Sequence, residues 1–284
     1  MTEQPRPTWG EYYDAIASQM LLYTVSNRSL AEAADLRPGQ SVVDLACGSG
    51  LTSQAALAAV PEGLRLTLID NTPSMVGAAR ARLGDKVAAY HVADAMDVAS
   101  VVTEKVDRVL CNLTFFSFKD PEAVLRQVRQ VLKPTGLIVF SVHNTYFNTN
   151  GTLVSPQWAL LRHLHEQGAL PRGVNDVDRL PNQRSIEGTL QQVGFKPALF
   201  KVVPVEPAAP EWEPAGELYR LLQLSPVFGG EDGVERSLGA LQAAAGAIAA
   251  NRPAWRVVIF AAQPQLSAEE AFRLRFGDRL PGQP

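Results

Sequence analysis

The sequence has little cysteine, no long apolar run and no excess of one charge, and each shortage excludes a class of protein. Two cysteines among 284 residues cannot build a disulfide framework, and no Cys-x-x-Cys pair indicates structural zinc. The longest apolar runs, residues 137–142 and 241–250, are far shorter than the about 20 residues that span a bilayer. With 26 basic and 29 acidic side chains, the net charge of −3 gives no overall attraction to nucleic acids or anionic membranes.

The composition predicts a globular protein but leaves its function open. The first residues contain no basic stretch followed by an apolar one, so we expect no secretory signal and a cytoplasmic location. Residues are 46% hydrophobic and 19% charged, which is enough apolar material for a sizeable core. The length allows either one large domain or two small ones.

Short β-rich runs alternate with helical patterns along the first half of the chain. The expected helices are residues 9–35, 51–60, 73–83 and 121–133. The expected strands are residues 41–46, 64–70, 87–92, 106–111 and 136–142. This alternation predicts a doubly wound, parallel α/β sheet.

The pattern changes after residue 142. Residues 144–183 are rich in Asn, Pro, Gly and Arg, and residues 206–254 are first Pro-rich and then Ala-rich. Between and after these two segments we expect a helix at 185–195 and strands at 198–205 and 255–262.

A glycine turn joins the first expected strand to the helix that follows it, in the stretch from Asp44 to Gly50. Glycines let a backbone approach a ligand closely, and open α/β sheets bind ligands beyond the carboxyl ends of their strands. A dinucleotide site would require a small apolar residue at position 53, where this chain has Ser53, so an NAD-dependent oxidoreductase is disfavoured. A carboxylate at Asp44 would also oppose a phosphate, although it could attract a cation.

The stretch Asp-x-x-Cys-Gly-x-Gly at residues 44–50 resembles the first motif of the class I, Rossmann-like S-adenosylmethionine-dependent methyltransferases, and the likeness continues in order over residues 12–142. The resemblance implies S-adenosylmethionine as cofactor. It also implies a seven-stranded, mostly parallel sheet with the last strand antiparallel, and helical lid insertions. We therefore expect a single domain over residues 1–284, divided into an N-terminal helical lid (9–36), a cofactor core (40–142), cap insertions (144–183 and 206–254) and a closing strand (255–262).

The resemblance also implies which residues contact the cofactor. Asp70, at the end of the second strand, is similar to the family's ribose-binding acid, since a carboxylate accepts two hydroxyl hydrogen bonds well. Asp94 and Ala95 resemble the pair that contacts adenine, with Asp97 as a nearby alternative to Asp94. The full set of expected cofactor residues is Tyr13, Asp44, Ala46, Gly48, Ser49, Gly50, Asp70, Asn71, Met75, Asp94, Ala95 and Asn112.

Candidates for catalysis lie beyond the fifth strand. His143 follows that strand directly and has an ordinary pKa near neutrality, so it is a candidate base or substrate ligand, with Tyr146 as a second candidate. His163 and His165 are two positions apart and would face different sides of a helix. We see no metal-binding cluster in the sequence and expect no metal site.

Aromatic side chains are candidates for contacts with the acceptor. They occur after the fourth strand and in the two insertions, at Phe115, Phe116, Trp158, Trp212 and Tyr219. For the two phenylalanines, ordinary packing of the loop is an equal alternative. Neither insertion has the dense Lys and Arg content that phosphate backbones require, so we expect no nucleic-acid partner and no membrane partner. A homodimer is left open.

The resemblance implies methyl transfer to an oxygen, nitrogen or carbon atom of a small organic molecule. One alternative is a non-methylating enzyme that uses the same cofactor site, namely a cyclase, lyase or decarboxylase. A second alternative is a non-catalytic protein that binds S-adenosylmethionine. Acidic residues at three strand ends, Asp44, Asp70 and Asp94, argue against the second alternative.

Overall fold

A computed structural model describes residues 8–144, 147, 180–205 and 255–276. Tyr146, Trp158, Trp212 and Tyr219 lie outside the described residues, as does the side chain of Phe116. The same is true of residues 206–254 and of most of 144–183, so the predictions made for the two cap insertions stay predictions.

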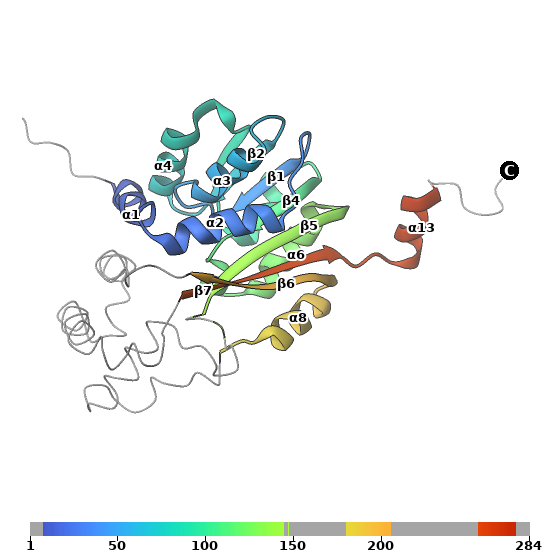
Figure 1. Cartoon of the computed structure of the whole chain (residues 1–284). Coiled ribbons are helices and arrows are strands. Elements are labelled where there is room, and N and C mark those ends of the chain that lie inside the picture. The colour runs from blue at the N-terminus through green and yellow to red at the C-terminus, as the bar shows by residue number, and fades with distance from the viewer. Residues whose placement is uncertain (1–7, 145–146, 148–179, 206–254, 277–284) are drawn as a thin grey trace, which may run out of the picture.

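The described residues form one seven-stranded sheet with the strand order β3-β2-β1-β4-β5-β7-β6 (Figure 1). The strands are β1 (Ser41–Leu45), β2 (Arg65–Asp70), β3 (Ala89–Val92), β4 (Val106–Cys111), β5 (Leu132–His143), β6 (Phe195–Val205) and β7 (Trp255–Pro264). Neighbouring strands from β3 to β5 pair in parallel, whereas β7 is antiparallel to both β5 and β6. The predicted mostly parallel sheet with an antiparallel last strand is confirmed.

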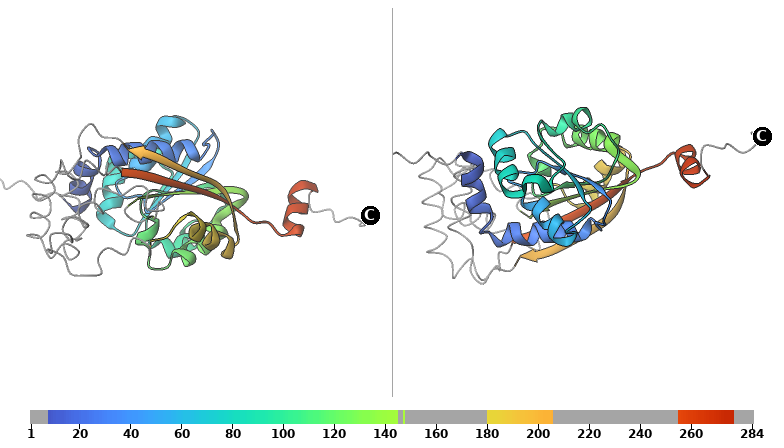
Figure 2. Two further views of the ribbon diagram at one scale, coloured as in Figure 1. Left: turned by 60° about the horizontal axis from the view of Figure 1, so that its bottom comes forward. Right: turned by 90° about the horizontal axis from the view of Figure 1, so that it is seen from above.

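Helices cover both faces of the sheet, which accounts for the continuous apolarity of its central strands (Figure 2). Successive residues of a strand point to opposite faces, and accordingly Val42 and Val43 of β1 belong to two different hydrophobic cores. The first core contains α1 (Trp9–Ala17), α2 (Leu21–Ala33), α3 (Leu51–Ala59) and α4 (Pro73–Leu83). The second contains α5 (Val98–Val101), α6 (Pro121–Val131) and α8 (Gln183–Gln192).

Three short 3₁₀ turns, η1 (Gly84–Lys86), η2 (Ala95–Asp97) and η3 (Phe115–Ser117), complete the connections between these elements. After β7 the chain leaves the sheet and forms α13 (Ala268–Phe276), which stands apart from the domain (Figure 1). In the part of the chain that the structure describes, none of the helices is long and apolar enough to cross a bilayer.

Several boundaries differ from the prediction, and two of the differences have a clear structural reason. The helix expected over residues 9–35 is two helices, because the backbone at Met20 is extended (φ −82°, ψ 128°) and the Met20 side chain is buried in the first core. Strand β5 begins at Leu132 rather than at residue 136. Residues 133–136 are opposite residue 107 alone, since Val106 pairs with Leu132 and Arg108 with Leu137. The predicted break at Pro134 to Gly136 is therefore a local irregularity within a longer strand.

Candidate functional site

The carboxyl ends of the parallel strands open into a cavity of about 520 Å³. Its walls come from α1, α2, the turn after β1, the start of α3 and the segments that follow β2, β3 and β4. Ten of the twelve expected cofactor residues line it, namely Tyr13, Ala46, Gly48, Ser49, Asp70, Asn71, Met75, Asp94, Ala95 and Asn112. Asp44 and Gly50 do not.

Asp70 is held at the centre of this strand-end edge by two backbone hydrogen bonds. The N–H of Gly48 donates to Oδ2 of Asp70 at 2.9 Å, and the N–H of Thr72 donates to Oδ1 at 2.9 Å. An ionised carboxylate offers about four acceptor positions, so each oxygen can accept a further hydrogen bond from a ligand. The Asp70 carboxylate is thus oriented by the backbone and still able to bind a pair of hydroxyl groups.

The glycine turn gives the ligand side of the cavity a bare backbone. Gly48 has a left-handed backbone (φ +52°), which favours glycine, and a Cβ built there would be 4.0 Å from Cε1 of Tyr13. The neighbouring Ser49 side chain is buried, and its hydroxyl has no hydrogen-bond partner among the described residues. Buried hydroxyls normally have a partner, so a ligand in this cavity is a natural partner for Ser49.

Asp44 and Gly50 support the turn and do not line the cavity, so their predicted contact with the cofactor stays a prediction. The Asp44 carboxylate is 1% exposed and accepts a hydrogen bond from the Ser53 hydroxyl at 2.6 Å. Burial raises the pKa of Asp44 to about 7. Gly50 precedes α3 with φ +83°, and a Cβ there would lie 3.0 Å from Leu83 and 3.2 Å from Ala79 of α4. Glycine at position 50 therefore allows α3 and α4 to pack closely.

Asp94 is exposed and lies at the β3 end of the cavity. Its carboxylate accepts a hydrogen bond from the N–H of Met96 at 2.8 Å, which orients it at the start of η2. Ala95 is buried beside it. The cavity lining contains Asp94 but not Asp97, so the geometry favours Asp94 over the alternative that the sequence left open.

A buried polar network forms the β4 end of the cavity, and the sequence interpretation recognised only Asn112 in it. Asn27 of α2 and Thr52 of α3 also line the cavity, and both hydrogen-bond within the network. The signal that could have revealed them is the polar character of the buried face of α2. Leu22, Ser26 and Leu30 recur there at helical spacing, with Asn27 beside them.

Helices α1 and α2 together form an aromatic wall over the glycine turn. The Tyr13 hydroxyl donates to the Tyr23 hydroxyl at 2.8 Å, with the two rings edge to face at 6.0 Å. Trp9 packs against Tyr13 with ring centroids 6.2 Å apart, and all three aromatic residues line the cavity. Burial raises the pKa of Tyr13 well above its ordinary value, so its hydroxyl stays protonated at neutral pH.

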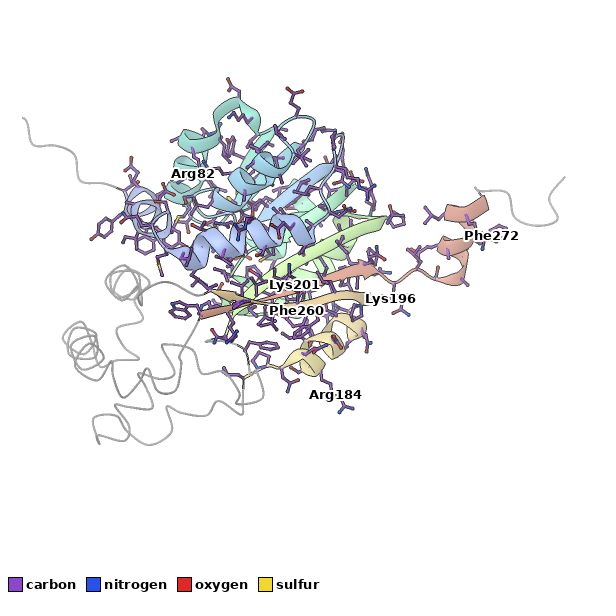
Figure 3. The ribbon with its side chains drawn as sticks, viewed as in Figure 1. Arg82, Arg184, Lys196, Lys201, Phe260 and Phe272 are labelled. Carbon is purple, nitrogen blue, oxygen red and sulfur yellow. The ribbon has the colours of Figure 1, made fainter. Side chains whose placement is uncertain are left out.

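Arg82 of α4 (Figure 3) links α1 to the glycine turn. Its guanidinium donates to the Ser49 carbonyl at 3.0 Å, to the Gln54 side chain at 3.0 Å and to the Asp14 carboxylate of α1. The arginine and aspartate side chains are 17% and 27% exposed. At the start of α1, Gly10 lies so close to the Ser74 carbonyl that an added Cβ would be 2.2 Å from its oxygen. Helix α1 is therefore docked at both ends.

His143 is not among the residues that line the cavity. It ends β5, half-buried, with its ring edge to face against Trp255 at a centroid separation of 5.5 Å. Burial lowers the pKa of His143 to about 4, so its imidazole is uncharged at neutral pH and is a weak base. The structure gives the predicted base no contact with this cavity.

Phe115 is also absent from the lining of this cavity, and its predicted role as a wall for the acceptor stays a prediction. Its side chain is 3% exposed and stacks on Phe140 at a centroid separation of 4.2 Å, and Phe140 stacks on Phe260 at 5.3 Å. Phe115 instead borders a separate hollow of about 420 Å³ between α6 and α8. Phe118, three residues further along, lines the first cavity.

Comparisons with known proteins agree on the strand-end core. Residues 43–140 match the family model described as a methyltransferase domain. A ubiquinone biosynthesis O-methyltransferase of Aromatoleum aromaticum is 29% identical over 163 residues, which are 56% of this chain and 65% of that protein. A thiol S-methyltransferase of Rattus norvegicus is 24% identical over 59% of this chain and 67% of its own length.

A further relative, the ubiquinone biosynthesis O-methyltransferase of Xanthomonas campestris, is 34% identical over 38% of this chain. The chain therefore spans less than half of that relative's length, 44% of it.

Solved structures share the fold. An S-adenosylmethionine-dependent methyltransferase from Thiobacillus denitrificans, in complex with S-adenosylhomocysteine, has a TM-score of 0.55 at 16% identity and covers 93% of this chain and 100% of its own. The [4+2]-cyclase SpnF has a TM-score of 0.53 at 17% identity and covers 84% of this chain and 80% of its own. At these identities the likeness concerns the fold alone, and the same fold includes a cyclase.

Proposed function

We propose that this chain, as a class I, Rossmann-like S-adenosylmethionine-dependent methyltransferase, transfers the methyl group of S-adenosylmethionine to a small organic acceptor. The relatives are named for methyl transfer to oxygen and to sulfur, and these names support a small-molecule acceptor. The observation that carries the proposal is the Asp70 carboxylate, which the Gly48 N–H orients at the centre of the cavity.

The residues of the cavity fit this cofactor. The oriented Asp70 carboxylate suits the two hydroxyl groups of a ribose, and the bare Gly48 backbone admits the ligand without a side-chain clash. The unpartnered Ser49 hydroxyl offers one more polar contact. Asp94 and Ala95 at the β3 end would hold the adenine, and the polar network around Asn112 at the β4 end would hold the methionine part.

When bound, the cofactor supplies a sulfonium methyl group whose leaving group is already activated by its positive charge. The task of this chain is then to bind, orient and exclude water. The aromatic wall of Trp9, Tyr13 and Tyr23 closes one side of the cavity, and the contacts of Arg82 keep that wall in place. Because the neutral His143 lies away from the cavity, we propose that positioning of the acceptor contributes more to the rate than proton abstraction by His143.

A turnover assay tests the proposed reaction. The protein is incubated with S-adenosylmethionine carrying a labelled methyl group and with panels of small phenols, amines and thiols. Label in the acceptor together with an equal amount of S-adenosylhomocysteine supports methyl transfer. Methylthioadenosine as the product, or acceptor conversion with the cofactor unconsumed, would instead support the alternative of a non-methylating enzyme on the same fold.

A further inference from the structure

A hydrogen-bonded relay beneath the cavity fixes which way the side-chain amides of two asparagines face. The carbonyl of Tyr23 can only accept, and the Ser26 hydroxyl donates its proton to it at 3.1 Å. The Ser26 oxygen therefore acts as an acceptor toward Asn112, whose Nδ2 group lies 3.1 Å away. The second proton of the Asn112 Nδ2 group is donated to Oδ1 of Asn27 at 2.6 Å.

The other end of Asn112 leads to the same orientation. The backbone N–H of Leu113 can only donate, and it lies 3.1 Å from the Ser141 hydroxyl oxygen. The Ser141 hydroxyl in turn donates to Oδ1 of Asn112. The Ser26 anchor thus requires that Asn112 presents its NH₂ group to α2, and the hydrogen bond from Ser141 to its oxygen agrees with this orientation.

This orientation has a consequence for Asn27. Its Oδ1 accepts both from Asn112 and from the Thr52 hydroxyl, the latter at 2.8 Å, so its Nδ2 group faces away from the network. Asn27 is 6% exposed and lines the cavity, and its Nδ2 group has no acceptor among the described residues. The relay therefore leaves two N–H donors of Asn27 for a group inside the cavity.

The strand order indicates which group that is. Along the edge β3-β2-β1-β4, the site residues occur in the order Asp94, Asp70, Gly48 and Asn112. A cofactor with adenine at Asp94 and ribose at Asp70 places its amino-acid end beside Asn112 and Asn27. That end carries one group that accepts hydrogen bonds, the α-carboxylate, and an amide NH₂ group can only donate.

We propose that Asn27 binds the α-carboxylate of the cofactor and makes the site selective for adenosyl compounds that retain the amino-acid tail. The inference rests on the proposed function and deepens it. Asn27 lies outside residues 43–140, the part of the chain that matches the family model. It is assigned by the direction of the hydrogen bonds and by its burial.

Two ligands and two variants test the assignment by calorimetry. S-adenosylhomocysteine carries the carboxylate, whereas methylthioadenosine lacks the whole amino-acid tail. The Asn27→Asp variant keeps an oxygen that accepts from Asn112 and Thr52 and replaces only the outward donor. We expect its Kd for S-adenosylhomocysteine to rise by about tenfold or more, with its Kd for methylthioadenosine changed by less than about threefold. Asn27→Ala, which introduces no buried charge, should show the same selectivity.

Ser26→Ala is the matched control. Ser26 lies on the same helix and in the same network but is fully buried and does not line the cavity. Its replacement leaves the Ser141 anchor of the Asn112 amide in place, so Asn27 should keep its orientation and the affinities for both ligands should change by similar factors. Equal losses for both ligands in the Asn27 variants, or no loss in either, would overturn the assignment. Failure of the unmodified protein to bind S-adenosylhomocysteine would instead refute the proposed function.

Discussion

The backbone N–H of Gly48 donates to the carboxylate of Asp70 at 2.9 Å, which joins the turn after β1 to the end of β2 across 22 residues of sequence. Because a backbone amide is the donor, the orientation of the carboxylate depends on the shape of the turn. The glycine turn and Asp70 therefore act as one unit, and a substitution in either should weaken the binding of the same ligand.

Asp70→Ala tests the acid half of this unit. We expect the affinity for S-adenosylhomocysteine to fall by about tenfold or more, because two hydrogen bonds to a charged acceptor are lost. Calorimetry measures the affinity, and a thermal unfolding curve checks that the variant is folded. An affinity within about twofold of the unmodified protein would remove Asp70 from the ribose site.

Gly48→Ala and Gly50→Ala form a matched pair for the turn. Both residues have a left-handed backbone, so each replacement should cost about 1 kcal/mol of the free energy of unfolding from the backbone alone. At position 50 the new methyl group also meets Leu83 and Ala79, so the additional loss should be in stability. At position 48 it enters the ligand side of the turn, so the additional loss should be in affinity for S-adenosylhomocysteine. The same pattern of losses at both positions would contradict this division of roles.

The contact between Arg82 and Asp14 should couple helix α1 to ligand binding. Arg82→Lys and Asp14→Asn should each weaken S-adenosylhomocysteine binding. The loss of binding free energy in the double variant should be smaller than the sum of the two single losses by about 1 kcal/mol. Arg65 and Glu104, whose side chains are 66% and 72% exposed, provide the control pair, for which we expect no coupling in ligand affinity. Additive effects of Arg82→Lys and Asp14→Asn would show that the contact does not serve binding.

Asp44 should make stability depend on pH. Because burial raises its folded pKa to about 7 from an ordinary value of 3.8, the unfolded chain releases this proton first as pH rises. The contribution of Asp44 to stability is therefore full below about pH 4 and is lost as pH approaches 7. Asp44→Asn removes this pH-dependent loss. The unfolding free energy of the variant minus that of the unmodified protein should therefore rise as the pH increases from about 4 to 7, by at most about 4 kcal/mol. Denaturant unfolding at several pH values measures the difference, and a difference that does not change with pH would refute the assignment.

His143 should titrate well below neutrality. Its folded pKa of about 4 lies below the unfolded value of 6.5, so this residue reduces stability as pH falls from about 6.5 toward 4. Nuclear magnetic resonance of the imidazole nitrogens should find a neutral ring at pH 6, and His143→Gln should leave the pH profile of turnover unchanged between pH 6 and 8. An inflection near pH 6.5 that His143→Gln abolishes would restore His143 as the catalytic base.

The sequence was sufficient for much of the fold because the strands that build the central sheet are short continuous apolar runs, such as Val42 to Leu45. It did not predict the break at Met20, which depends on the burial of that side chain against the sheet. It also placed the start of β5 too late, because a Pro-Thr-Gly segment usually interrupts a strand. Here the segment is part of an irregularity in which residues 133–136 lie opposite the single residue 107 of β4.

The candidate site was predictable where it depends on strand ends. A parallel sheet brings the carboxyl ends of its strands to one edge, so Asp70 and Asp94 had to lie close together. The roles of Asp44 and Gly50 were not predictable, because the same motif positions can line a ligand or support the turn. Asn27 depends on the way α2 packs against β4, and periodicity alone does not show this packing.

A crystal structure with S-adenosylhomocysteine is the most direct test of the central claim that this strand-end cavity is the cofactor site. We predict the ribose hydroxyls within hydrogen-bond distance of Asp70, the adenine beside Asp94 and Ala95, and the carboxylate on the Nδ2 group of Asn27. A ligand bound elsewhere on the molecule, or with its ribose away from Asp70, would contradict the account.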